Sequence, residues 1–316
     1  MRLRLLSALT LITAMTAACG GDATTPGSGS ATSGAPDPTT FAAQVASTDL
    51  VADQASRVQI GVFQSDPTEG VRLLTSGSVA VLISPVEGGE GTPVQTDAAY
   101  VPAPGTQGDA SGQPVLSSPD LARGVYQADA TLDAAGLWQA EVTFSVEGTS
   151  LTLGAAFEVG DEHALPAPGD RALRTENLTV ETAEDLQALD SRAQDGAPLP
   201  DEELHEATIA GAIAKGRAAL VLFATPVYCQ SQFCGPTTDA LQQLAAEGPT
   251  DVDFIHVEIW ADYGASTLNQ SATDWLLRDG DLTEPWLFLI DADGRIADRW
   301  GPLFDVGEVR AALDAL

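Results

Sequence analysis

The stretch AALVLFATPVYCQSQFCGPTTDAL, residues 218–241, combines a continuous apolar run with two closely spaced cysteines. The run at 218–224 is typical of a strand that is covered on both faces. The segment PTTDALQQLAAEG, 236–248, predicts a helix, because a proline stands near its first position and a glycine follows its end. Cys229 and Cys234 therefore lie between a buried strand and a helix.

The spacing of the two cysteines determines how they can be joined. Their five-position separation corresponds to about 140° around a regular helix, which would point the two sulfurs apart. A disulfide requires Cα atoms within ~7 Å of each other. We therefore expect a loop from Cys229 to Cys234, with the helix beginning at or after Gly235.

The segments around this stretch follow a recognisable order. Further buried strands, helices and a hairpin are predicted at 201–216 (helix), 252–260 (strand), 272–280 (helix), 286–300 (hairpin around Asp291–Gly294) and 309–316 (helix). The passage VLFATPVYC resembles the one in which a thioredoxin strand leads to the nucleophilic cysteine. TEPWLFLIDADGRI, 283–296, is similar to the thioredoxin segment in which a cis-proline opens a strand beside the cysteines. The resemblance implies an α/β thioredoxin-like domain at 201–316, with Pro285 as a cis-proline that faces the substrate.

Residues 41–161 have a different pattern, typical of strands. In GLWQAEVTFSVEG, 136–148, apolar residues such as Trp138 alternate with polar ones, as expected for a half-buried strand. ARGVYQADATLDAAGLWQAEVTF, 122–144, resembles the small immunoglobulin-like modules of bacterial extracytoplasmic proteins. We expect an all-β immunoglobulin-like sandwich at 41–161 that serves as a spacer or interaction module, with Trp138 and Tyr126 in its core. Residues 162–200, rich in Pro and Gly turns, form a connector.

The first 40 residues indicate export and anchoring. MRLRLLSALTLITAMTAAC, 1–19, has two arginines, a short apolar core and small residues, which is the pattern of a secretory signal peptide. Its ending, 16–19, resembles a bacterial lipoprotein signal, which implies lipidation of Cys19. Residues 20–40 contain 16 Gly, Ser, Thr or Pro among 21 and predict a disordered tether that reaches roughly 25 Å. We expect an extracytoplasmic protein that a lipid attaches to the cell membrane, in a compartment where disulfides persist.

The composition is strongly acidic. With 14 basic residues against 45 acidic ones, the formal charge is −31. So large a negative charge repels phosphates, which excludes binding to nucleic acid or to anionic lipid through general electrostatics. It favours solubility.

The cysteine pair allows several functions. We expect a thiol–disulfide oxidoreductase that acts on extracytoplasmic protein thiols or disulfides, because the disulfide of a small exposed loop is readily attacked. Cys229, which the strand reaches directly, is the expected attacking thiol and Cys234 the resolving one, although Cys234 lies nearer the amides of the helix N-terminus. Alternatively, the chain is a noncatalytic binding protein whose permanent Cys229–Cys234 disulfide stabilises the fold by roughly 2 kcal/mol. FATPVYCQSQFCGPTTDAL, 223–241, is similar to the Sco-type copper chaperones, which hold the metal between two cysteines and a distal histidine, and this similarity implies Cu(I) binding. A third alternative is a peroxidase of atypical peroxiredoxin type.

Other polar residues carry weaker hypotheses. We expect His256 to be a core residue, His205 to be a packing or surface residue, and His163 to be exposed. Glu258, at the end of the strand 252–260, is either a proton-shuttling carboxylate or a plain acidic strand end. We assign no metal ligands and, apart from the Cu(I) alternative, no cofactor.

Overall fold

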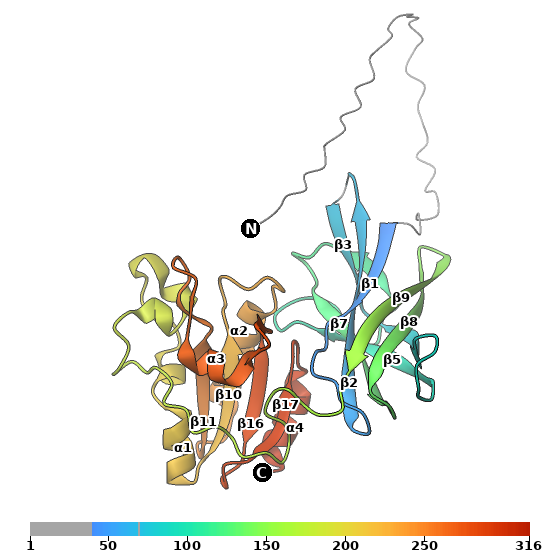
Figure 1. Cartoon of the computed structure of the whole chain (residues 1–316). Helices are drawn as coiled ribbons and strands as arrows, with labels where there is room; N and C mark the ends of the chain where they lie inside the picture. Colours follow the sequence, from blue (N-terminus) through green and yellow to red (C-terminus); the bar gives the residue numbers. More distant parts are fainter. Residues whose placement is uncertain (1–39, 69) are drawn as a thin grey trace, which may run out of the picture. The chain divides into compact units, whose positions relative to one another are not determined.

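The computed structural model describes residues 40–68 and 70–316, which belong to a single compact unit (Figure 1). Within these residues there are seventeen strands and four α-helices. The longest α-helix has 14 residues, and two of the others have only seven. The described part of the chain is therefore mainly β.

Nine strands form one antiparallel sheet in the first half of the chain (Figure 1). Their hydrogen-bonded order is β6-β3-β2-β7-β5-β4-β8-β9, and β1 pairs with β2. The strands are β1 (Phe41–Val45), β2 (Ala55–Asp66), β3 (Gly70–Thr75), β4 (Ser78–Pro85), β5 (Val94–Pro102), β6 (Val115–Ser117), β7 (Gly124–Thr131), β8 (Gly136–Val146) and β9 (Thr149–Val159).

The apolar side chains that alternate along β8 from Trp138 to Val146 are buried, as their pattern predicts. Trp138 and Tyr126 are fully buried in the core that this sheet encloses, which confirms the expectation for both side chains. The expected immunoglobulin-like sandwich is wrong, because all nine strands belong to one hydrogen-bonded sheet rather than to two separate sheets. Alternation in a single strand indicates which face is buried, but pairing between distant strands decides whether a sheet divides.

The second half of the chain contains a four-stranded sheet with the order β11-β10-β16-β17. The strands are β10 (Ala218–Ala224), β11 (Val252–Glu258), β16 (Trp286–Ile290) and β17 (Ile296–Trp300). Every residue of β10 is buried, as its apolar run predicts. Only β10 and β11 are parallel; the two other pairings are antiparallel.

Four helices cover the two faces of this sheet. The core on one face includes residues of α1 (Ile209–Lys215) and α3 (Gln270–Leu276). The core on the other face includes residues of α2 (Cys234–Glu247) and α4 (Val306–Asp314). Two small ribbons complete the region, β12 (Trp260–Asp262) with β13 (Thr267–Leu268) and β14 (Leu277–Arg278) with β15 (Asp281–Leu282). The α2 helix and the hairpin β16–β17 lie where the sequence predicts them.

The expected α/β thioredoxin-like fold class is wrong. Strands dominate the described residues, the helices of the second half are short, and its sheet has one parallel pair among three. The predicted helix 201–216 shows why the sequence pattern misled. It is divided into a 3₁₀ turn, η4 (Glu202–His205), and α1, because the side chain of Thr208 accepts a hydrogen bond from the amide of Gly211 and so starts a new helix.

The segment between the two sheets folds back onto the four-stranded sheet. It contains the 3₁₀ turns η2 (Leu186–Ala188) and η3 (Ser191–Gly196), which precede η4. Asp190, Ser191 and His205 of this segment are buried. The connector thus supplies polar groups to the interior beside the cysteine loop.

Candidate functional site

The cysteine pair lies where β10 gives way to α2. Cys229 and Cys234 form a disulfide, and their Cα atoms are 6.0 Å apart. The chain between them is irregular, as expected. The helix begins at Cys234, one residue earlier than predicted, and Cys229 remains outside it.

The two sulfurs differ in their access to solvent. Cys229 is half-buried, whereas Cys234 is completely buried in the core beneath α2. A partner protein can therefore reach Cys229 first. This difference supports the expected order of attack, with Cys229 first and Cys234 second.

Local donors surround the Cys229 sulfur. The backbone amide of Cys234, the first residue of α2, donates to Cys229 Sγ over 3.4 Å. The hydroxyl of Ser231 lies 3.1 Å from the same sulfur. Amides at a helix N-terminus favour a negative charge, so this position would stabilise a Cys229 thiolate.

A carboxylate lies beside the other sulfur. Glu284 Oε2 is 3.2 Å from Cys234 Sγ and also accepts a hydrogen bond from the Thr225 amide over 3.2 Å. Burial raises the pKa of Glu284 to about 7; the Thr225 amide opposes this shift and the charge of Glu258 adds to it. Near neutral pH this carboxyl group can both accept and return a proton.

Glu284 precedes Pro285, and the peptide bond between them is cis, as predicted. Pro285 lines the same cavity as Ser231 and Phe233 of the cysteine loop. The structure thus brings Pro285 close to the cysteine pair. Its role in facing a substrate stays a prediction.

Glu258 is not the carboxylate nearest to the cysteines. It is buried, accepts hydrogen bonds from the amides of Ser191 and Ile259 at 2.8 and 2.9 Å, and has a pKa that burial raises. Its position fixes the connector to the end of β11. Glu258 is the last residue of β11, so it is an acidic strand end as one hypothesis expected, although a buried one. A proton-shuttling role for Glu258 stays a prediction.

A cavity of about 670 Å³ opens beside the cysteine loop. Its wall includes the aromatic residues Tyr228, Phe233, Trp260 and Tyr263 together with Glu284 and Pro285. The rings of Tyr228 and Tyr263 are stacked, with centroids 3.8 Å apart. Such a surface offers contacts to apolar groups.

Two groups among the described residues have the composition of a metal site. One consists of Cys229, Cys234 and Glu284, whose sulfur and oxygen atoms lie within 4.8 Å of one another. The other consists of Asp190, His205 and His256, which are all buried. The histidine pair lies with Asp190 and is not part of the cysteine group.

Sequence reasoning missed Glu284 and Asp190. The sequence shows Glu284 beside the expected cis-proline, so its position at the cysteine loop follows once that proline is placed there. Asp190 has no such indication, because it lies in the connector. His163, expected to be exposed, is half-buried and contacts the Arg299 guanidinium at 2.7 Å.

The lipidation residue Cys19 lies outside the described residues, as do the signal peptide 1–19 and most of the tether 20–40. Within 40–68 and 70–316, none of the helices has the length and apolar character that a bilayer crossing requires.

The comparisons with known proteins give no relative: no family model, no curated protein and no solved structure matches this chain.

Proposed function

We propose that this chain exchanges thiols and disulfides with another extracytoplasmic protein through Cys229 and Cys234. The observation that carries the proposal is the asymmetry of the pair. Cys229 is accessible and lies against the first amide of α2, whereas Cys234 is buried and lies 3.2 Å from a carboxyl group with a pKa of about 7. A permanent disulfide requires neither the helix amide at one sulfur nor the proton acceptor at the other.

The first step would involve Cys229. In the reduced protein its thiolate attacks one sulfur of a partner disulfide, a bond forms between the two proteins, and the partner's S–S bond breaks. The departing partner sulfur takes a proton from solvent. The aromatic wall formed by Tyr228 and Tyr263 would hold the partner segment during this step.

The second step would involve Cys234 and Glu284. The Cys234 thiol gives its proton to the Glu284 carboxylate, and its sulfur then attacks Cys229 Sγ. The mixed disulfide breaks, and the second partner sulfur leaves as a thiolate that takes up a proton. Two electrons pass from the cysteine pair to the partner; the same steps in reverse oxidise a partner dithiol.

A redox titration of the purified protein, read by thiol alkylation and mass, tests this proposal. A reduction potential between about −300 and −100 mV is expected for a pair that exchanges electrons in such a compartment. A pair that stays oxidised below about −300 mV would show that the disulfide is a permanent structural bond, and would contradict the proposal.

Copper handling is a second candidate, favoured by the grouping of Cys229, Cys234 and Glu284 within 4.8 Å. Two thiolates are ligands that select Cu(I). The metal-capable group at the cysteines contains no histidine among the described residues, in contrast to the Sco-type pattern. Titration of the reduced protein with Cu(I) distinguishes the candidates, because a copper site would protect both thiols from alkylation at one ion per chain.

We also propose that the protein is extracytoplasmic and is attached to the membrane through a lipid on Cys19. The support is the sequence of residues 1–40, with its lipoprotein-like cysteine followed by a polar tether. An oxidising compartment suits a disulfide between Cys229 and Cys234.

A further inference from the structure

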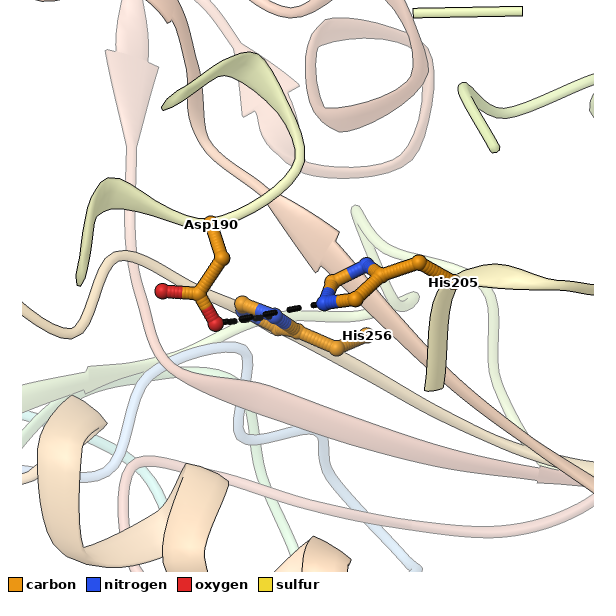
Figure 2. Close-up of side chains that lie close together, drawn as sticks. All are labelled: Asp190, His205 and His256. Atoms are coloured by element: carbon orange, nitrogen blue, oxygen red, sulfur yellow. Dashed lines mark ion pairs between the residues drawn. The ribbon is translucent and has the colours of Figure 1, made fainter. Parts of the chain in front are cut away.

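Three buried side chains from separate segments meet beside the four-stranded sheet. Asp190 is the N-cap of η3, His205 ends η4, and His256 lies in β11. Each is at most 1% exposed. Figure 2 shows the Asp190 carboxylate directed toward both imidazole rings.

The distances among the three side chains resemble those around a small tetrahedral ion. Asp190 Oδ2 lies 3.4 Å from His256 Nδ1 and 3.9 Å from His205 Nε2. Zinc binds nitrogen and oxygen ligands at about 2.0–2.2 Å, which places tetrahedral ligand atoms about 3.4 Å apart. The distance from Asp190 to His256 matches this spacing. The distance from Asp190 to His205 is slightly longer, and a small movement of either side chain would shorten it.

Three of the four ring nitrogens of the two histidines have no hydrogen-bond partner among the described residues. Neither ring nitrogen of His205 has a hydrogen-bond partner in the described structure, and the same holds for His256 Nδ1. His256 Nε2 lies 3.1 Å from the carbonyl oxygen of Ala224, which fixes the orientation of that ring. Burying an unpaired polar atom is costly, and a metal ion would satisfy His205 Nε2 and His256 Nδ1 together.

The surrounding charges are compatible with a cation. Arg192 is the basic group in contact, with Nη2 2.7 Å from Asp190 Oδ2 and 2.8 Å from Asp201 Oδ2. It competes for the Asp190 oxygen, but Asp201 offers the same nitrogen another carboxylate. With Asp239 also 3.4 Å from Arg192, the guanidinium has two carboxylates, Asp201 and Asp239, besides Asp190. Arg192 Nε and its amide also hold Asp190 Oδ1, as hydrogen bonds commonly do for carboxylates that bind metals.

We propose that Asp190, His205 and His256 form a structural zinc site that fastens the connector turns η3 and η4 to β11. Two imidazoles and a carboxylate are ligands that zinc accepts, with a water molecule as the fourth. The site is closed to solvent, so it would stabilise the fold and would not take part in a reaction on an external substrate.

The test uses the purified protein with its disulfide oxidised, so that thiolates cannot bind the ion. Elemental analysis after dialysis against Zn²⁺ and gel filtration is expected to give one zinc per chain. His205→Gln and His256→Gln should each reduce this value to a small fraction. His163→Gln, a histidine outside the cluster, and the double variant Cys229→Ser/Cys234→Ser should both keep one zinc per chain.

A measurement on the wild-type protein keeps the proposal testable even if the histidine variants do not fold. The protein loaded with Co²⁺ should show the visible absorption of tetrahedral cobalt without the charge-transfer band of a thiolate ligand. A zinc content below about 0.1 ion per chain in the wild-type protein would mean that no specific site exists, and would overturn the proposal. So would zinc that persists in both histidine variants, or an octahedral cobalt spectrum.

Discussion

Glu284 Oε2 lies 3.2 Å from Cys234 Sγ, although the two residues are 50 positions apart in the chain. Antiparallel pairing of β10 with β16 brings them together, because the cysteine loop follows the end of β10 and Glu284 precedes the start of β16. The half-buried carboxyl group therefore stands 3.2 Å from the buried sulfur and within 4.8 Å of the accessible one. This relationship gives the proposed resolving step a proton acceptor.

Glu284→Gln should slow the resolving step, because an amide cannot accept the thiol proton. We expect the rate of mixed-disulfide resolution at pH 7 to fall at least about tenfold. The wild-type rate should rise with pH through about 7, as Glu284 ionises, and the variant should lose this rise. Stopped-flow measurement across pH 5–9 checks it, with Glu90→Gln, an exposed acid, as the control. Equal rates in the variant and the wild-type protein would remove Glu284 from the mechanism.

The same carboxyl group predicts a pH dependence of stability. Its pKa rises from 4.5 to about 7 on folding, mainly through burial. The contribution of the protonated Glu284 to the free energy of unfolding is fully present below pH 4.5. It is lost as the pH rises to about 7, because the carboxyl group then ionises in the folded protein as well. The loss is of the order of 3 kcal/mol. Relative to Glu284→Gln, the wild-type protein should therefore lose free energy of unfolding between pH 4.5 and 7 and then reach a plateau.

Denaturant titrations of both proteins at several pH values measure this difference. The disulfide must stay oxidised throughout, so that the titration of free thiols does not contribute. A difference between the two proteins that does not change with pH would show that folding does not raise the pKa of Glu284.

The aromatic wall beside the cysteine loop should govern recognition of a protein partner. Tyr263→Ala removes the ring stacked on Tyr228. We expect KM for a protein disulfide to rise several-fold while kcat changes little, because the substitution leaves both sulfurs in place. Reaction with a small disulfide reagent should be unchanged. Leu137→Ala, an exposed apolar residue of β8, is the control, and an equal loss with both reagents would indicate a general structural effect.

The sequence predicted local features better than long-range ones. The buried strand 218–224, the irregular cysteine loop and the hairpin at 286–300 each follow from neighbouring residues, and each is found. The cis bond before Pro285, which the resemblance to thioredoxins implied, is also found. The pairing of strands does not follow from local pattern. The continuous nine-stranded sheet and the mainly β character of the chain were therefore mispredicted.

The same limit explains the missed site residues. Glu284 reaches Cys234 only through the pairing of β10 with β16, and Asp190 reaches His205 and His256 only through the folding of the connector onto β11. A carboxylate in a turn-rich connector looks like any solvated acid in a sequence. Its burial becomes evident only once the tertiary contacts are known.

The proposed membrane attachment depends on Cys19. If this residue is lipidated, Cys19→Ser should move the protein from the membrane fraction to the soluble fraction, because the tether that follows it has no apolar run of its own. Fractionation followed by intact-mass analysis of the mature N-terminus measures both consequences. A mature chain that starts at another residue without a lipid would show that the anchor was assigned wrongly.

Single-cysteine variants separate an exchange enzyme from a structural disulfide. An attacking thiol and a resolving thiol have different fates: without the resolver the mixed disulfide with a partner accumulates, whereas without the attacker it does not form. Because Cys229 is accessible and Cys234 is buried, Cys234→Ser should accumulate mixed disulfides with other envelope proteins. These should appear as heavier bands that disappear on reduction, and Cys229→Ser should not produce them. The reverse pattern would transfer the attacking role to Cys234. If neither variant traps a partner and both lose only about 2 kcal/mol of stability, the amount expected from opening so small a loop, the disulfide is structural and the exchange proposal fails.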